Sequence, residues 1–441
     1  MKKIAVIGAG IAGLSAAYEL TKLGYKVKVF EKNDHPGGRM SARWKDNLAF
    51  DFGADFLAEN YTQLKAYASE LNVEWGKTEP NGAQCVVRDG EVFPLLLSGP
   101  LDVLRFKVIP FMARIKLLIW CAKLRTKYKR MNFFNLSILP EDLDFDNANS
   151  YLNKHVHKDV ADYIADPFTS SMQFHRCNEI STATMFALMK MMVTPELNFW
   201  LTRTKGGMGA IPEALAKRLD ITLNTEVSNV TPKDRVIHVV HAGKRSTFDA
   251  VVLATTADVA KKILKNPTAE QKHILDATKY ASTLVISFKA PAGILGNAHC
   301  TYVPFVENQV IGGYTNEGRK GEDFIENGKS LINVYLHEST ANDLMKNADE
   351  DIYALVQREL AKVCPNVRGK IHLLEPHDIH RWAAAMPKFD YKFITIAKRF
   401  TQHFNGQNNI YLAGDYLNSP WTEGACRCGT RVAQMIHKRS S

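Results

Sequence analysis

The chain has 441 residues, 46% of them hydrophobic and 23% charged, which is typical of a globular protein with two or three domains. Its seven cysteines are few and unevenly spread, so a secreted disulfide framework is not indicated. No metal site is expected, because no cysteine–histidine spacing fits one. The net charge of +10 is local: residues 103–133 hold nine bases and no acid, which leaves +1 (10 − 9) for the rest. A nucleic-acid-binding surface is therefore not indicated.

The amino-terminal segment follows the order strand, glycine turn, helix, strand, acid. Residues 3–7 form an apolar run that predicts a strand, and residues 14–23 predict a helix. A second strand is expected over residues 26–30, and it ends at Glu31. Residues 8–13 lie between the first strand and the helix and read Gly-Ala-Gly-Ile-Ala-Gly. This arrangement predicts a dinucleotide-binding unit, although the turn alone does not separate FAD from NAD.

Each part of this unit has a physical role. The first glycine permits a tight turn, the second lets the backbone approach a diphosphate, and the third allows the helix to pack closely on the strand. The phosphates then lie at the helix amino end, where free N–H groups favour negative charge. The acid at the end of the second strand is placed to accept hydrogen bonds from ribose hydroxyls. The cofactor-binding residues expected here are Gly8, Gly10, Ile11, Ala12, Gly13 and Glu31.

The same segment superficially resembles a signal peptide, because two lysines precede an uncharged run. The spaced glycines and the amphipathic continuation to Leu23 favour a folded helix instead. No apolar run is long enough to span a bilayer, so no transmembrane helix is expected. We therefore expect a cytoplasmic protein, with peripheral attachment to the cytoplasmic face of a membrane as a candidate feature.

Two motifs after the first unit carry a family resemblance. Residues 36–41 read Pro-Gly-Gly-Arg-Met-Ser, and residues 50–56 read Phe-Asp-Phe-Gly-Ala-Asp-Phe. Together with the first unit they resemble the flavin amine oxidase / protoporphyrinogen oxidase superfamily. The resemblance implies that Arg39 contacts the FAD pyrophosphate, where a planar cation can clamp a diphosphate. It also implies that a loop beside the isoalloxazine completes this set of cofactor residues: Gly38, Arg39, Met40, Gly53, Ala54 and Asp55.

Later segments extend the resemblance over nearly the whole chain. Residues 205–215 resemble the family's glycine–methionine turn and helix, and residues 249–256 resemble its Val-Val-Leu-Ala-Thr-Pro strand and turn. Val227 matches a position that touches the adenine. At the carboxyl end, residues 410–415 and 422–425 resemble the family's last strand and the helix whose amino end points at flavin O2, where it favours the reduced flavin. This adds Gly414, Asp415, Glu423, Gly424 and Ala425 to the expected cofactor residues.

The order of these motifs predicts the architecture. We expect an α/β fold in which residues 1–75, 205–275 and 388–441 form a discontinuous Rossmann-like FAD-binding domain. Residues 76–204 and 276–387 form an inserted α+β substrate domain with a mixed sheet and a mostly helical first part. FAD is expected to be non-covalent, because no cysteine follows Trp382 where a covalent attachment would be expected.

The branch of the family follows from one position. Thr283 stands where the amine-oxidising branch places a lysine near flavin N5, so ordinary monoamine oxidation is not favoured. Other stretches resemble the protoporphyrinogen oxidase and carotenoid/squalene-type branch. By resemblance, Trp382 lies against the flavin, and Trp421 and Phe389 are candidate walls of a substrate pocket. Each of these aromatic residues could equally be a packed core residue.

Residues 111–130 predict an unusual helix within the basic segment. Ile115, Leu118, Ile119 and Ala122 share one face, lysines recur on another, and Trp120 and Tyr128 are of the interfacial type. Such a helix can lie on an anionic membrane surface, so residues 103–133 are a candidate membrane-surface segment. The alternative is a helix that packs its apolar face on the core.

The sequence therefore predicts an FAD-dependent oxidoreductase that abstracts a hydride from a C–H bond of a bulky, largely apolar substrate and delivers it to flavin N5. A porphyrinogen, an isoprenoid or a similar compound at a membrane surface fits this expectation. The alternatives are a soluble amine or amino-acid oxidase that produces peroxide, and a flavoprotein without enzymatic activity. Hydride transfer needs no dedicated acid or base, and the sequence identifies none and assigns no oligomeric state.

Overall fold

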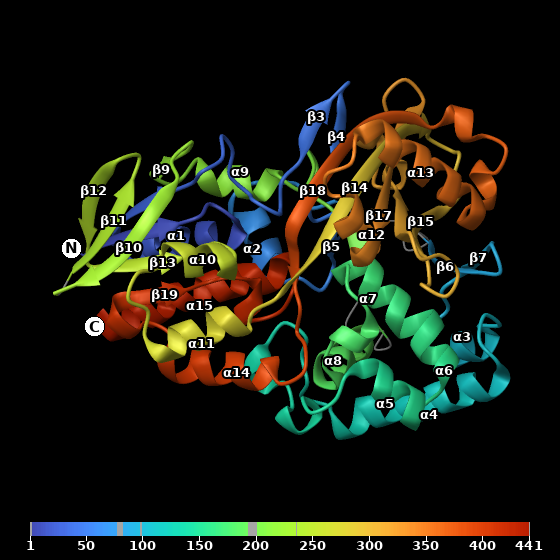
Figure 1. Ribbon diagram of the computed structural model, residues 1–441, viewed down its shortest axis with the longest axis horizontal. Helices are drawn as coiled ribbons and strands as arrows, with labels where there is room; N and C mark the ends of the chain where they lie inside the picture. The colour runs from blue at the N-terminus through green and yellow to red at the C-terminus, as the bar shows by residue number, and fades with distance from the viewer. Residues whose placement is uncertain (1, 77–82, 98, 193–200, 235, 441) are drawn as a thin grey trace.

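The computed structural model describes residues 2–76, 83–97, 99–192, 201–234 and 236–440. Figure 1 shows a parallel sheet with its helices and both termini at one end of the molecule. At the other end a second sheet lies with helices α12 and α13, and a group of helices, α3 to α8, lies on the side away from them. The fold is mixed α/β, as the sequence predicts.

The parallel sheet has the strand order β19-β13-β1-β2-β9, which brings together strands from the beginning, the middle and the end of the chain. Residues 4–6 in its centre are fully buried, as expected for a strand covered on both faces. Helix α1 packs against α15, and the antiparallel strands β10, β11 and β12 lie near β1 and β13. The strands of these two sheets are β1 (Lys3–Ile7), β2 (Lys26–Phe30), β9 (Ile221–Thr222), β10 (Val227–Lys233), β11 (Val236–His241), β12 (Lys244–Phe248), β13 (Ala250–Leu253) and β19 (Ile410–Leu412).

The second sheet has seven strands in the order β18-β14-β17-β16-β15-β6-β7, and all neighbours are antiparallel except β15 and β6. One face packs on α13 through alternate residues such as Ile286 and Val334, and the other face packs Val285 and Tyr335 against β4. Its strands are β6 (Ala83–Arg88), β7 (Glu91–Pro94), β14 (Tyr280–Pro291), β15 (Ala298–Tyr302), β16 (Ile311–Asn316), β17 (Lys329–Leu336) and β18 (Glu375–Pro387). Residues 76–204, the first part of the expected substrate domain, thus contribute β6 and β7 to this sheet as well as helices.

Short strands and the remaining helices connect these layers. Strands β3 (Arg43–Lys45) and β4 (Leu48–Phe50) form a hairpin, and β5 (Leu57–Ala58) pairs with β8 (Leu201–Thr202). The helices are α1 (Ile11–Lys22), α2 (Gln63–Glu70), α3 (Pro100–Arg105), α4 (Phe111–Lys127), α5 (Ala148–His155), α6 (Lys158–Val160), α7 (Asp166–Gln173), α8 (Thr182–Met192), α9 (Ala210–Ala216), α10 (Ala257–Ile263), α11 (Ala269–Ala277), α12 (Glu338–Leu344), α13 (Asp349–Val363), α14 (Phe393–Arg399) and α15 (Thr422–Ser440).

Helix α4 covers the expected interfacial segment, and the structure corrects one expectation there. Trp120 does not face solvent: it is 4% exposed and packs edge-to-face on Phe186, with ring centroids 5.2 Å apart. A large indole gains more from burial in this helical core than at the surface. Within the described ranges, the structure holds no helix with both the length and the apolar character needed to cross a membrane.

Candidate active site

The first glycine turn forms a backbone cradle at the amino end of α1. Gly8 has φ +101°, and a Cβ there would come within 2.8 Å of the Ala254 carbonyl oxygen, so only glycine fits. A Cβ on Gly13 would overlap the Gly8 carbonyl oxygen, which keeps helix and turn in contact. A Cβ on Gly10 would meet nothing closer than 4.0 Å, so space remains above it. No side chain caps the amino end of α1, so its N–H groups can bind a phosphate.

A second glycine loop lies directly on this turn. The Gly37 N–H donates to the Ala9 carbonyl at 2.8 Å, and a Cβ on Gly38 would stand 3.4 Å from Gly10 Cα. Met40, at the end of the loop, is buried. Two glycine turns with little side-chain bulk therefore face each other, as a bound diphosphate requires.

Arg39 and Asp415 form an ion pair between segments that are far apart in the sequence. Arg39 Nη1 lies 2.8 Å from Asp415 Oδ2, and Arg39 Nη2 donates to Asp415 Oδ1 at 2.9 Å. The carboxylate follows Gly414 and is 5% exposed, and Arg39 also donates to the Ala385 carbonyl at 2.8 Å. The bidentate pair fixes the guanidinium at the edge of the glycine cradle.

The end of β2 and the start of β10 bound the other side of this region. Glu31 is 6% exposed and accepts hydrogen bonds from the N–H groups of Ala9 (2.7 Å) and Asn33 (2.9 Å). Each carboxylate oxygen still has a lone pair for a ligand hydroxyl. Val227 is buried at the first position of β10. These residues suit the ribose and adenine end of a dinucleotide.

The loop from Asp51 to Asp55 packs onto the arginine loop. The Ala54 N–H donates to the Arg39 carbonyl at 2.7 Å, and a Cβ on Gly53 would overlap that same carbonyl oxygen. Trp382 supports the loop, because its indole N–H donates to the Phe52 carbonyl at 2.6 Å and its ring stacks on Phe52. Trp382 thus holds the loop on which a flavin ring is expected to lie.

The amino end of α15 is built from an unusual backbone. Trp421, just before the helix, has φ +134°, a conformation that L-residues adopt only under strain. A Cβ on Gly424 would overlap the Ser419 carbonyl, and Ala425 is buried in the same turn. Glu423 is fully buried, and its carboxylate accepts from the N–H groups of residues 62–64, at the start of α2. In this structure the Glu423 side chain caps a helix, and backbone N–H groups of α15 remain for a cofactor.

The pocket residues expected from the sequence occupy different surroundings. Trp421 lies in an aromatic group with Phe56, Phe133 and Phe134, at centroid distances of 6.4, 4.8 and 6.2 Å. Thr283 is fully buried in β14, and its hydroxyl donates to the Leu336 carbonyl at 3.3 Å.

The fourth candidate, Phe389, lies apart from this aromatic group. It is 1% exposed, and its ring packs on Phe393 at a centroid distance of 5.2 Å. The described contacts therefore join Trp421 to aromatic side chains that were not among the candidates, and they place Phe389 away from Trp421.

The sequence reasoning missed a buried charge cluster beside the Asp51–Asp55 loop. Lys320 Nζ lies 2.6 Å from Glu317, 2.8 Å from Asp55 and 3.1 Å from Asp51, and the four side chains are at most 7% exposed. The three carboxylates are close enough to hold a cation, and the ammonium group takes that position. Burial, followed by the charge of Asp55, raises the pKa of Glu317 to about 8 against the opposing effect of Lys320. Asp51 and Asp55 lie in the motif at residues 50–56, but no motif marks Glu317 or Lys320, which come from a distant segment.

Polar side chains also cross the face of the second sheet that points toward this cluster. Ser287, Asn333 and Thr315 are cross-strand neighbours on β14, β17 and β16, and Thr315 donates to Glu317 at 2.7 Å. The Ser287 hydroxyl and both amide atoms of Asn333 are buried and have no hydrogen-bond partner among the described residues. Buried polar atoms normally have partners, so this row is suited to hydrogen-bond a ligand.

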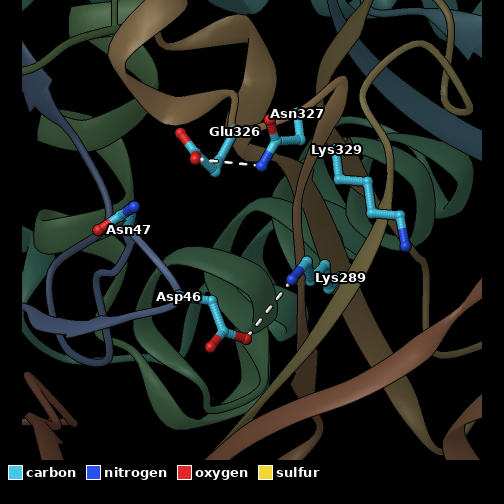
Figure 2. Close-up of a pocket in the computed structure, with 6 residues that line it drawn as sticks. All are labelled: Asp46, Asn47, Lys289, Glu326, Asn327 and Lys329. Atoms are coloured by element: carbon cyan, nitrogen blue, oxygen red, sulfur yellow. Dashed lines mark hydrogen bonds and ion pairs between the residues drawn. The ribbon is translucent and has the colours of Figure 1, made fainter.

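A separate polar pocket lies on the surface between the β3–β4 turn and the second sheet. It has a volume of about 390 Å³ and is lined by charged and amide side chains, with Asp46 3.5 Å from Lys289 (Figure 2). It contains none of the residues expected to bind the cofactor. The candidate active site is therefore the region between the glycine turns, Asp55 and α15.

Comparison with known proteins agrees with this geometry. The family model of flavin containing amine oxidoreductases matches residues 11–437. The chain belongs to this family. It is an FAD-dependent oxidoreductase, and the residues described above fit the cofactor: two glycine turns and an uncapped helix for the diphosphate, Glu31 for a ribose, and the amino end of α15 for the flavin.

Individual relatives share little sequence but most of the length. The chain is 20% identical to protoporphyrinogen oxidase 2 of Arabidopsis thaliana, with 99% of this chain and 94% of the relative covered. It is 22% identical to an L-amino-acid oxidase of Sistrurus catenatus edwardsii, with 100% and 87% covered. With the mitochondrial protoporphyrinogen oxidase of Nicotiana tabacum it shares 28% identity over 172 residues, 38% of this chain and 32% of the relative. A triple mutant of putrescine oxidase has a similar structure, with TM-score 0.80, 18% identity and 99% of each chain covered.

Proposed function

We propose that this oxidoreductase acts on a bulky, largely apolar substrate, of the porphyrinogen or isoprenoid type, by presenting a C–H bond to the flavin. When bound, FAD supplies the two-electron acceptor for the hydride. The observation that carries the proposal is the aromatic group of Phe56, Phe133, Phe134 and Trp421 at the amino end of α15. An aromatic wall binds an apolar body and excludes water from the reacting carbon.

Thr283 supports the same proposal. Threonine carries no charge, and the Thr283 hydroxyl donates to the Leu336 carbonyl of β17. This position therefore provides no cation for the flavin. Trp382 and Arg39 position the cofactor loop, and Trp421 orients the substrate. The proposed reaction requires orientation of the substrate and exclusion of water, and it requires no titrating side chain.

Anaerobic reduction of the FAD-loaded protein tests the proposal. A porphyrinogen or a polyisoprenoid should bleach the flavin absorbance, and Trp421→Ala should slow that bleaching at least about tenfold by loosening the substrate. Trp44→Ala is the matched control, because Trp44 is 56% exposed and lies outside the site. Bleaching by simple amines alone, or equal rates in the two variants, would contradict the proposal.

Oxidation of an amine is the second candidate, and the buried carboxylates favour it. Asp55 Oδ2 has no hydrogen-bond partner among the described residues, and Asn333 pairs with Thr315, whose hydroxyl donates to Glu317. A carboxylate only accepts hydrogen bonds, so its natural partner is an N–H donor such as an ammonium group. Peroxide formed on a panel of amines, and lost in Asp55→Asn, would establish this activity in place of the first.

A further inference from the structure

Helix α4 presents an apolar face to solvent although another face of it packs on the protein. The packed face consists of Ala113, Leu117, Trp120 and Leu124, all at most 4% exposed. Large apolar side chains on the outer side of α4 and on the neighbouring α3 are mostly exposed: Leu101 66%, Phe111 58%, Met112 58% and Ile119 66%. The helix therefore packs on the core through one face, while Ile119 of the expected apolar face is exposed and Leu118 of that face is half-buried. Exposed apolar side chains grouped in this way mark an interaction surface.

Cations flank this apolar face without neutralising partners. Lys116, Lys123 and Lys127 share one side of the helix by their spacing, and all three are exposed. No carboxylate in the described part of the chain lies within ion-pair distance of Lys116, Lys127, Lys129 or Arg130. An apolar stripe bordered by lysines can lie in the headgroup layer, because the long side chains reach the phosphates while the stripe enters the lipid.

A pocket at the carboxyl end of α4 adds a specific anion site to this face. It has a volume of about 330 Å³ and is lined by residues 127–131, Ile138 and Pro140, which include three cationic side chains. Behind it, Lys190 is 8% exposed and donates to the carbonyls of Lys129 and Met131 at 2.7 Å each. No described carboxylate pairs with this buried ammonium, and burial lowers the pKa of Lys190. Three positive charges thus line one small pocket, and a fourth is bonded to the backbone of two of its lining residues, so a bound anion would compensate this local excess of charge.

We infer that α3 and α4 dock this protein on a membrane containing anionic phospholipid, and that the pocket at Lys127, Lys129 and Arg130 binds a phosphate headgroup. The inference rests on the proposed function, since an apolar substrate is collected from such a surface. The chain leads directly from this face to Phe133 and Phe134, which contact Trp421. A second copy of the chain is disfavoured as the occupant, because two such faces would bring like charges together.

Vesicle co-sedimentation of the FAD-loaded protein, read by flavin fluorescence, tests the inference. Wild type should bind vesicles of phosphatidylcholine with phosphatidylglycerol and not vesicles of phosphatidylcholine alone. Lys127→Ala/Lys129→Ala/Arg130→Ala should weaken binding about 100-fold, since each cation near an anionic surface contributes about fivefold. Lys233→Ala/Lys244→Ala/Arg245→Ala is the matched control: it removes three exposed cations from β10 and β12, at the far end of the molecule (Figure 1), and should bind like wild type. Ile119→Ser should weaken binding without changing its salt dependence.

The possible outcomes separate this inference from the proposed function. Equal binding by the two triple variants would overturn the headgroup pocket, and absence of wild-type binding would overturn the docking. If inorganic phosphate stabilised the protein while vesicles did not bind, the docking would be overturned and the pocket would be a site for a soluble anion. A dimer in light scattering that Ile119→Ser dissociates would identify a second copy instead. Flavin bleaching measured without vesicles should be equal in wild type and in all of these variants. Absence of bleaching in every one of them would count against the proposed reaction and not against the docking.

Discussion

Replacement of Lys320 by Met should destabilise the protein in a manner that depends on pH. The lysine side chain is 1% exposed and lies within 3.1 Å of three carboxylates that are at most 7% exposed. Removing one partner from a buried ion pair costs about 3–5 kcal/mol, because the remaining charges are left uncompensated. Methionine has a similar length and no charge, so the loss of unfolding free energy measures the contribution of the lysine charge to the cluster.

The pH dependence follows from the sign of the shifted carboxyl pKa. Burial raises the pKa of Glu317 from 4.5 to about 8, so between these values the folded protein holds a proton that the unfolded chain has released. The contribution of Glu317 to stability should therefore fall as pH rises through this window, by about 1.4 kcal/mol per pH unit at most. Burial also raises the pKa of Asp51, and Lys320 opposes both shifts. Without Lys320 the protonated carboxyl groups are favoured further in the fold, so the variant should lose most stability, relative to wild type, at high pH.

Urea unfolding at pH about 5.5 and about 8.5, followed by tryptophan fluorescence, measures both effects. The control is Lys329→Met, which removes a surface pair with Glu375 at 2.6 Å and should cost less than about 1 kcal/mol at either pH. The reasoning would be refuted if Lys320→Met cost no more than this control, or if its cost were the same at both pH values. Adding Glu317→Gln should recover part of the loss at high pH, because it removes one of the uncompensated acids.

Three further predictions concern the cofactor site and the thiols. Gly13→Val should abolish FAD binding, because the side chain would overlap the Gly8 carbonyl, whereas Gly99→Ala, where a Cβ meets nothing within 4 Å, should bind normally in a fluorescence titration. Asp415→Asn should weaken FAD binding roughly tenfold or more, since it removes the charge that fixes the guanidinium; unchanged affinity would contradict that role. Six of the seven thiols are buried, and burial raises the pKa of the half-buried Cys121 to about 12, so a thiol reagent at neutral pH should label at most one cysteine before urea is added.

The sequence predicted those features of the fold that depend on local chemistry. The strand at residues 3–7, the glycine turn and the strand at residues 26–30 occur as expected, because apolar runs and obligatory glycines determine them locally. Strands at residues 83–88 and 91–94 were not foreseen, since the first is stabilised by pairing with β15 far along the chain and the second by pairing with the first.

The site shows the same division. The glycine turns and the acid of residue 415 were recognised from motifs, and their proximity in space follows from the sheet order. The cluster around Lys320 could not be found from the sequence. Its three acids and one lysine become a buried, interacting group only when tertiary packing brings them together and removes water from them. A helix was predicted over residues 111–130 and is observed over residues 111–127, but the side it turns toward the core depends on neighbours such as α8.

Glu423 lies in the first turn of α15 and its carboxylate caps the amino end of α2, and this has a consequence for the order of assembly. Residues 62–64 receive their capping acceptor from a side chain synthesised some 360 positions later. Likewise, α1 completes its packing only when Gly429 brings the last helix against Ala12. A nascent chain whose α15 segment has not yet been synthesised therefore lacks a finished nucleotide cradle, and loading with coenzyme must wait for that segment.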